Sequence, residues 1–277
     1  MKRIVISLLM LMVASASIVC AQGTHKIIPF SRQNFTVLDS AEYKFTFKLH
    51  FLRDVKKGER FENDLIVLAS KDFVKTESIW PEPEQDPDKM RAGEKIWTEG
   101  RGLGGTEVFK NLKEGKETVT VKLTTPSQPF IYEEALSKQT WKISREKRKI
   151  LGYTCQKATT SFLGRNYTAW FTKDIPVQNG PWKFGGLPGM ILNVSDSEQH
   201  YVFECTDVEQ LKEKVPIVKY NYYKKYEKTT REELNKLIKW MHDDAYAYVI
   251  YHSPQLEGQL DSTASNRKTP YNPIELE

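Results

Sequence analysis

Repeated alternation of apolar and polar residues is the feature of this sequence that most constrains its fold. Between Tyr153 and Val208 four such segments follow one another: YTCQKATTSF, YTAWFT, MILNVS and HYVFECTDV. In the last of them Tyr201, Phe203 and Cys205 occupy every second position. A period of two is that of a strand with one buried face, and short connections join antiparallel neighbours. This region therefore predicts an antiparallel meander of four strands.

Further strands are expected upstream of the meander, where short apolar runs or apolar alternation recur. They are predicted at 43–48, 64–70, 73–78, 107–124 (a hairpin that turns at Glu114-Gly115) and 139–144. Two segments are expected to lie between or after strands. Residues 81–88 carry three prolines and four acids and predict an exposed loop. Residues 145–149 are all charged and predict a turn.

One helix is predicted, over 230–246. Thr230 and Glu233 form a capping box, in which each side chain satisfies the other residue's backbone amide. The apolar residues that follow share one helical face, which we expect to lie against the sheet: Leu234, Leu237, Ile238, Met241 and Ala245. The polar tail after it, 253–277, is expected to be extended. The predicted fold is mainly β (α+β), a curved antiparallel sheet, bowl-like or half-barrel, with one C-terminal amphipathic helix.

The first residues predict a secretory signal peptide over 1–21. A basic start is followed by an apolar run from Ile4 to Val13 and by the small-residue exit Val19-Cys20-Ala21. The run is too short to span a bilayer, which takes about 20 residues. Cleavage after Ala21 is favoured over lipid attachment at Cys20, because Val19 suits a lipoprotein signal badly. The mature chain, 22–277, is then a single domain in the periplasm or at the cell surface.

Export changes what the two remaining cysteines can do. Cys155 and Cys205 can form at most one internal disulfide, and oxidising compartments favour such bonds. In a flat meander, however, their strands are not neighbours, so the pair would need a strongly curled sheet. Free, buried thiols are therefore the favoured prediction, with the disulfide as the alternative.

Motifs of known chemistry are missing or weak. The sequence contains no H-E-x-x-H, G-x-S-x-G or C-x-x-C. The pattern Gly100-x-Gly102-x-x-Gly105 lacks the strand before it and the helix after it that dinucleotide binding needs. His242-Asp243-Asp244 could ligate a metal but fits a solvated helix end better. The basic and aromatic stretch 220–228 favours a solvated strand or loop over nucleic-acid binding. We therefore expect no catalytic residue, cofactor, metal or nucleic acid.

The most specific stretch in the chain is Gly180–Ile191, GPWKFGGLPGMI. Leu187-Pro188-Gly189 predicts a type II turn in which Gly189 takes a positive φ. Gly186 and its neighbour allow a close backbone approach, and Phe184 and Leu187 are the expected apolar anchors. Two interpretations remain open. The segment is a packed connection into the next strand, which the residues favour, or a Gly-rich rim that meets a partner or ligand.

These residues resemble the GLPGLI family of exported proteins from diderm bacteria. The signature stands here as Gly186-Leu187-Pro188-Gly189-Met190-Ile191 and departs from the family only at Met190. The resemblance extends to Gly152–Ala158, Trp170, Ile175-Pro176, Gly180-Pro181 and the closing Asn272–Leu276. It implies export but assigns no catalytic residue. It marks a family motif, structural or partner-binding: Gly180, Pro181, Phe184, Gly186, Leu187, Pro188, Gly189 and Ile191.

Three functions from different classes follow. The leading hypothesis is a non-enzymatic envelope protein that carries a small apolar ligand, or binds through the concave face of a curved sheet, with peripheral membrane contact as a further option. The second is a protein-binding accessory subunit of an outer-membrane transporter or surface complex. The third is a hydrolase whose residues come from scattered loops, which would show convergent His, Asp or Glu side chains in a cleft.

Overall fold

The structure is a computed structural model that describes residues 35–79, 103, 105–124, 127–254, 257–258 and 268–277. All of these lie in the compact unit from Asn34 to Glu277. The predicted signal peptide at 1–21, the cleavage site after Ala21 and the predicted loop at 81–88 lie outside the described residues. No helix in the described part of the chain is both long and apolar enough to cross a membrane.

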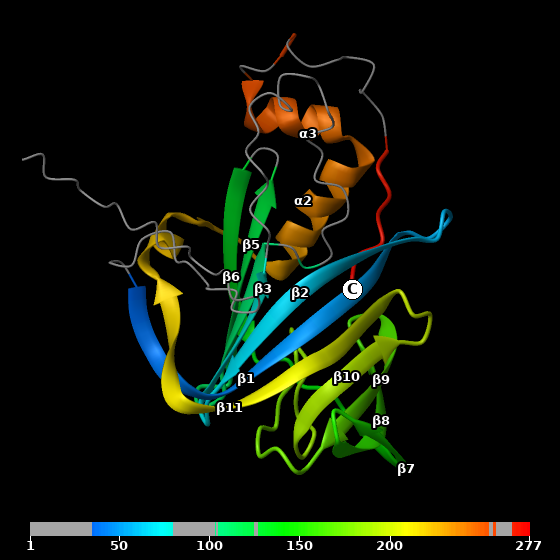
Figure 1. Cartoon of the computed structure of the whole chain (residues 1–277). Coiled ribbons are helices and arrows are strands. Elements are labelled where there is room, and N and C mark those ends of the chain that lie inside the picture. The colour runs from blue at the N-terminus through cyan, green and yellow to red at the C-terminus, as the bar shows by residue number, and fades with distance from the viewer. Residues whose placement is uncertain (1–34, 80–102, 104, 125–126, 255–256, 259–267) are drawn as a thin grey trace, which may run out of the picture. The chain divides into compact units, whose positions relative to one another are not determined.

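Twelve strands form one sheet in the order β12-β6-β5-β4-β3-β2-β1-β11-β10-β9-β8-β7 (Figure 1). Every neighbouring pair is antiparallel except β12 with β6, which is parallel. The mainly β, antiparallel prediction is confirmed. The strands are β1 (Phe35–Asp54), β2 (Glu59–Ala69), β3 (Phe73–Ile79), β4 (Thr106–Asn111), β5 (Lys116–Thr124), β6 (Ser127–Ala135), β7 (Lys142–Ile150), β8 (Tyr153–Phe162), β9 (Arg165–Thr172), β10 (Met190–Asp196), β11 (Tyr201–Tyr220) and β12 (Glu227–Lys228).

Two strands of 20 residues each, β1 and β11, run side by side through the middle of the sheet. Their pairing shifts register at three places. Such bulges bend a strand and increase its local twist, and Figure 1 shows β1 and β11 bending together. The sequence predicted only the part of β1 near Tyr43, because alternation is lost where the register shifts.

The predicted meander is confirmed, since β8, β9, β10 and β11 are antiparallel neighbours in that order. Two strands therefore separate Cys155 on β8 from Cys205 on β11, and both cysteines are free and buried. Burial raises the pKa of Cys155 to about 11 and that of Cys205 to about 12. The prediction of free, buried thiols is confirmed.

The charged turn predicted at 145–149 is wrong. These residues belong to β7, which forms one edge of the sheet and pairs with β8 alone among the described strands. Its side chains are exposed on both faces, so nothing in the sequence alternates. Edge strands rich in lysine and carrying a bulge are a common way to protect a sheet edge.

Two helices stand where one was predicted. The capping box is present, with Thr230 accepting from the amide of Glu233, and α2 runs over Arg231–Asp243. It ends at Asp244, whose side chain caps a second helix, α3 (Ala245–His252). Leu234 is buried, and Leu237, Ile238 and Met241 pack partly buried against the core, as expected. The single helix over 230–246 is therefore wrong beyond Asp243, because Asp244 competes for backbone amides as a cap.

The two faces of the sheet carry separate cores. On the first face, side chains from β1 to β11 pack with the loop after β9 and with both helices. On the second face a smaller cluster forms around Phe109 and the tyrosines of the short 3-10 helix η1 (Asn221–Lys225). Residues of β4 alternate between them, so that Val108 joins the first cluster and Phe109 the second. The family motif lies on the first face.

Candidate functional site

The loop between β9 and β10, residues 173–189, carries seven of the eight predicted motif residues, and Ile191 follows in β10. We call residues 173–189 the motif loop, and most of it lies inside the protein. Six of the eight predicted motif residues are buried: Gly180, Pro181, Phe184, Leu187, Gly189 and Ile191. Gly186 and Pro188 are exposed. Trp182 in the same loop is 1% exposed. The geometry is therefore that of a packed connection rather than an open rim.

Gly189 has a positive φ of 145°, as the sequence predicts. The turn itself differs from the type II turn expected, because the amide of Gly189 donates to the carbonyl of Leu187 at 2.8 Å. A bond that spans three residues makes this a γ-turn centred on Pro188. A Cβ atom at Gly189 would lie 1.9 Å from the carbonyl oxygen of Thr172, so only glycine fits this approach.

Phe184 anchors the loop in the first core. Its ring centroid lies 4.8 Å from that of Tyr167, 5.3 Å from Trp182 and 5.7 Å from Phe203, in edge-on arrangements. Edge-to-face pairs of this kind add about 0.5–1.5 kcal/mol each beyond the area they bury. The apolar anchor expected at Phe184 is thus part of an aromatic cluster that joins the loop to β9 and β11.

Three charged residues form a row across β4, β5 and β6, on the face of the sheet that the loop covers. Lys110 on β4 pairs in register with Glu117 on β5, and Glu117 pairs with Glu134 on β6. Directly paired residues project on the same face, so all three side chains stand on the first face. Lys110 and Glu117 are 2% and 0% exposed. Buried charges need partners, and the loop supplies them.

Lys183 belongs to the loop, and its ammonium group contacts the two glutamates of this row. Its Nζ lies 2.7 Å from Glu134 Oε1, 3.0 Å from Glu275 Oε1 and 3.9 Å from Glu117 Oε1. Burial alone would lower the pKa of Lys183, but the surrounding acidic groups, with Glu275 and Glu134 among them, raise it above its usual value. We call Lys110, Lys183, Glu117, Glu134 and Glu275 the loop network.

Lys110 holds the loop backbone rather than a carboxylate. Its Nζ donates to Asn179 Oδ1 at 2.7 Å, to the carbonyl of Phe184 at 2.6 Å and to that of Gly180 at 3.4 Å. Burial lowers the pKa of Lys110 to about 7, although the charge of Glu117 opposes the shift. Burial in turn raises the pKa of Glu117. Burial thus favours the neutral form of both groups on these paired strands.

The C-terminal tail completes the loop network. Glu275 binds Lys183 and also lies 3.6 Å from the guanidinium of Arg231 on α2. The tail is held further by Arg165, which is 5% exposed. Its Nη2 donates to the carbonyl of Pro273 at 2.6 Å and its Nε to that of Ile274 at 3.2 Å. The motif loop and the C-terminal tail, far apart in the sequence, thus meet through Lys183 and Glu275.

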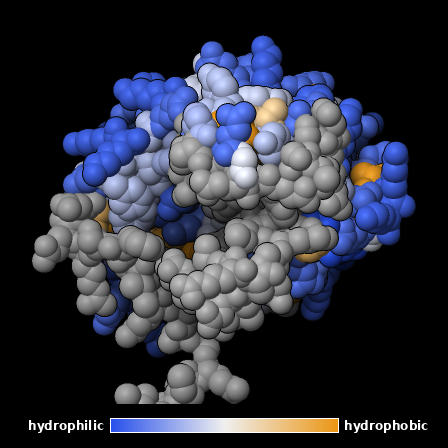
Figure 2. All heavy atoms as spheres, turned by 90° about the horizontal axis from the view of Figure 1, so that it is seen from above, coloured by the Kyte–Doolittle hydropathy of each residue, from blue (hydrophilic) through white to orange (hydrophobic). Residues whose placement is uncertain are grey.

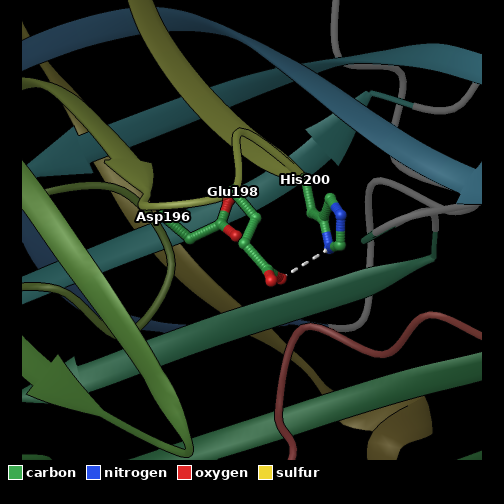
Figure 3. Close-up of side chains that lie close together, drawn as sticks. All are labelled: Asp196, Glu198 and His200. Atoms are coloured by element: carbon green, nitrogen blue, oxygen red, sulfur yellow. Dashed lines mark ion pairs between the residues drawn. The ribbon is translucent and has the colours of Figure 1, made fainter. Parts of the chain in front are cut away.

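Asp196, Glu198 and His200 lie close together at the turn between β10 and β11 (Figure 3). Their potential ligand atoms are all within 4.8 Å of one another. Arg165 Nη1, however, lies 3.2 Å from Asp196 Oδ2 and 3.3 Å from His200 Nδ1. A guanidinium among the potential ligand atoms repels a metal ion and already uses two of them. The cluster is an anchor for Arg165.

The weaker sequence candidates have structural roles. His242 hydrogen-bonds Thr269 of the tail through Nδ1 at 2.8 Å, and Asp244 caps α3. In the stretch 220–228 the tyrosines Tyr220, Tyr223 and Tyr226 are buried, whereas the lysines are exposed. Residues 221–225 form a 3-10 helix whose tyrosines pack into an aromatic core, and 227–228 form the short, exposed strand β12. The predicted solvated strand therefore holds only for the last two residues. Of the glycine pattern, Gly100 and Gly102 lie outside the described residues.

Sequence reasoning missed the charged members of the site, Lys110, Lys183 and Arg165. Lysine and arginine are almost never fully buried unless paired, and their partners here lie far away in the sequence. The one available signal was that Lys110 falls at the apolar positions of its strand, two residues after Val108. Alternation alone would therefore have placed Lys110 on the buried face.

Two open pockets lie at the β8–β9 hairpin. They measure about 250 Å³ and 340 Å³. They are lined by Ser161 and Asn166 among others, and neither touches the loop network. Figure 2 shows a face whose described residues are mostly hydrophilic, with isolated apolar residues.

Comparison with known proteins gives one family match and several distant structural likenesses. Residues 117–233 match the profile of the N-glycanase peptide, N-terminal domain, called PNGase F-II N. Two structures of PNGF-II share 18% and 19% identity, with TM-scores of 0.46 and 0.45, over 72% and 70% of this chain. This chain spans 32% of each PNGF-II chain. An uncharacterised conserved protein from Thermus thermophilus shares 9% identity and a TM-score of 0.34, over 68% of this chain and 90% of that one. No curated protein matches. The matched stretch begins at Glu117 on β5 and ends at Glu233 in the first turn of α2. Over these residues the chain is similar to the N-terminal domain of an N-glycanase.

Proposed function

We propose that this protein is an exported, non-enzymatic module of the bacterial cell envelope, of the GLPGLI type, that binds a protein partner through its surface. One observation carries the proposal: the first face of the sheet is filled by the protein's own side chains. Trp182, Phe184 and Lys183 are at most 1% exposed where a carrier would keep space for a ligand. This favours the accessory role over the ligand carrier.

The site also argues against a hydrolase. The titratable groups that converge on the first face belong to the loop network, and Lys110, Lys183 and Glu117 are too deeply buried to meet a substrate. The other convergent set, Asp196 with His200, is occupied by Arg165. The family match is to a part named an N-terminal domain, which supports a module rather than a complete glycanase.

The edge strand β7 is the surface that best fits a partner. It carries five basic residues and one acid, 5 − 1 = +4, and all six are exposed. Ile143 on the strand and Leu151 at its hairpin tip are each 46% exposed. Basic side chains around exposed apolar residues suit an acidic protein surface, since complementary charge speeds encounter and fixes register.

Site-specific photo-crosslinking tests this assignment in the native envelope. A photoreactive amino acid at Leu151 should give a discrete adduct with one protein. Lys142→Glu, Lys147→Glu and Lys149→Glu together should abolish it. The matched control reverses Lys56, Lys57 and Lys113, which are equally exposed in other turns, and should keep it. An adduct that survives the β7 triple variant, or adducts with lipid only, would contradict a protein partner at this edge.

Native mass spectrometry separates the module from a carrier. Protein purified from its own envelope fraction should be detected without any bound small molecule. A small molecule of constant mass that co-purifies in stoichiometric amount would restore the carrier hypothesis, since a filled first face leaves no room for one.

A further inference from the structure

We propose that Lys110 and Asn179 become joined by a covalent amide bond, formed by attack of the Lys110 amine on the Asn179 carboxamide, with Glu117 carrying the proton and ammonia as the product. This goes beyond the binding function. It describes an internal crosslink between β4 and the motif loop, 69 residues apart in the chain.

Geometry brings the two reacting groups together. Lys110 Nζ lies 2.7 Å from Asn179 Oδ1, and each residue is 2% exposed. The carboxamide carbon is one bond beyond that oxygen, and holding reactants this close inside a rigid core replaces a bimolecular encounter. Water, the competing nucleophile, is largely excluded from such a position.

Lys110 is suited to act as the nucleophile. Its nearest hydrogen-bond partners are a carboxamide and two backbone carbonyls, none of which carries a charge to hold a proton on the amine. Burial favours the neutral amine, and the cation of Lys183 favours it further. A neutral amine has the free electron pair that attack on a carbonyl carbon requires.

Asn179 is held as the electrophile. The backbone amide of Gly180 donates to Asn179 Oδ1 at 2.9 Å. Negative charge develops on this oxygen as the new bond forms, and a fixed N–H aimed at it stabilises that charge. Both residues belong to the motif loop, so the packing of the loop positions the carboxamide.

Glu117 is the proton carrier in this proposal, because it is the buried carboxylate on the strand beside Lys110. It pairs in register with Lys110, is 0% exposed, and its charge acts on Lys110. Its Oε1 accepts from Ser137 at 2.7 Å, whereas its Oε2 is buried without a hydrogen-bond partner. An unpartnered carboxylate oxygen in an apolar interior is costly unless it exchanges protons with a neighbour.

The step balances without a cofactor. The Lys110 ammonium gives a proton to Glu117, and the freed electron pair forms a bond to Asn179 Cγ. The C–N bond to Nδ2 then breaks, while Glu117 passes its proton to the leaving nitrogen. This nitrogen also takes the second amine proton and departs as an ammonium ion, which is ammonia carrying one proton. One amide is exchanged for another, nothing is oxidised, and Glu117 returns to its starting state.

Intact-mass measurement of the purified chain tests the crosslink directly. The folded protein should weigh about 17 Da less than its sequence, the mass of one ammonia lost in amine attack on an amide. Proteolysis should yield one branched peptide that joins the Lys110 and Asn179 segments. A chain at full sequence mass, with both segments recovered as linear peptides, would overturn the proposal.

Variants test the roles of Glu117 and Lys110 in the crosslink separately. Glu117→Gln removes the proton carrier but preserves shape, and should restore the full mass. Lys75→Arg is the matched control: Lys75 is an equally buried lysine on the second face, bound to carboxylates, and its replacement should leave the deficit of about 17 Da intact. A deficit that persists in Glu117→Gln would contradict the role of Glu117, and one that persists in Lys110→Arg would contradict the bond itself.

Discussion

The two faces of the sheet each bury a lysine with acidic neighbours, but they organise the surroundings differently. On the second face Lys75 Nζ lies 2.8 Å from Glu77 and 3.4 Å from Glu107, and between the rings of Phe109 and Tyr220. These partners come from β3, β4 and the end of β11, which meet there. On the first face the loop network joins β4, β5 and β6 to the motif loop and the tail.

The difference lies in which segments are joined rather than in strength. Glu107 also accepts a hydrogen bond from the hydroxyl of Tyr223, so the second-face cluster joins β3 and β4 to the end of β11 and to η1. Burial opposes the charge of Lys75, but Glu107 and Glu77 outweigh it and raise the pKa of that lysine. The loop network instead uses its buried charges to fix two segments outside the sheet, the motif loop and the tail, to β4, β5 and β6. Buried ion pairs of this kind specify an arrangement more than they stabilise it.

Removing the central lysine of each cluster should give the largest effects. Lys183→Met removes the buried cation from Glu134 and Glu275, which keep only Arg231. Lys75→Met leaves Glu77 and Glu107 without the lysine that both bind. Each should cost about 3–5 kcal/mol in the free energy of unfolding. Amide hydrogen exchange should then distinguish the two variants by the segments in which protection is lost. Lys183→Met should expose amides in the loop and the tail, and Lys75→Met only those of β3, β4 and 220–226. Identical exchange patterns would remove the distinction drawn here.

A smaller effect is expected at Gly189. Gly189→Ala forces a Cβ against the carbonyl of Thr172, at a φ of 145° that side chains rarely adopt. Backbone strain of this kind costs about 1–3 kcal/mol, before any shift of β9. Gly115→Ala is the control: it also has a positive φ, of 66°, but no atom lies within 4 Å of the added carbon. Denaturant unfolding of both variants should show the larger loss at Gly189, and equal losses would contradict the close approach.

Neutralising the tail carboxylate should cost less again. Glu275→Gln preserves the shape of the side chain but weakens the ion pairs with Lys183 and Arg231, at 3.0 Å and 3.6 Å. It should cost about 0.5–1.5 kcal/mol, the net contribution of one typical hydrogen bond. Glu133→Gln is the surface control, because its ion pair with Lys219 is open to solvent and worth about 0–1 kcal/mol. Thermal melts of the two variants should differ by several degrees. A tail that contributed nothing to the first face would make them alike.

The smallest effect concerns the two thiols, which report how often the first core opens. Their raised pKa values, about 11 for Cys155 and about 12 for Cys205, leave almost no thiolate at pH values near 8. Neither should react with a thiol reagent in the native protein, and both should react in denaturant without reductant. Reaction should be faster in Lys183→Met than in Lys75→Met, because only the first change loosens the core that holds them.

Much of the fold could be predicted because its signals are local. The Thr230 cap, the turn at Gly115 and the alternation through Phe203 each depend on residues within one element. The buried charges could not be predicted, since Lys110 and Lys183 find their partners only when the sheet register is known. The same holds for β7, where exposure on both faces erases the period of a strand. Asp244 was misjudged for a related reason: the same residue type serves in a helix interior and as a cap.

The positive φ of Gly189 was predictable from Pro188 and glycine, but the turn type was not. A γ-turn and a type II turn share those residues, and the choice depends on where Thr172 places its carbonyl. The meaning of the motif was likewise open in the sequence. Its packing became clear only with the aromatic cluster at Phe184 and the row of charges beneath the loop.

The central claim is that the motif loop is a packed part of the core and that the side chains of the loop network hold it in place. Amide hydrogen exchange tests it most directly. The amide of Ile191 donates to the carbonyl of Asn179 at 2.9 Å, and that of Gly185 to Gln139 Oε1 at 3.0 Å. These amides should exchange only through sub-global or global opening, as slowly as those of the central strands β1 and β11. Exchange at the rate of the exposed turn at Glu198 would show a mobile rim and contradict the account.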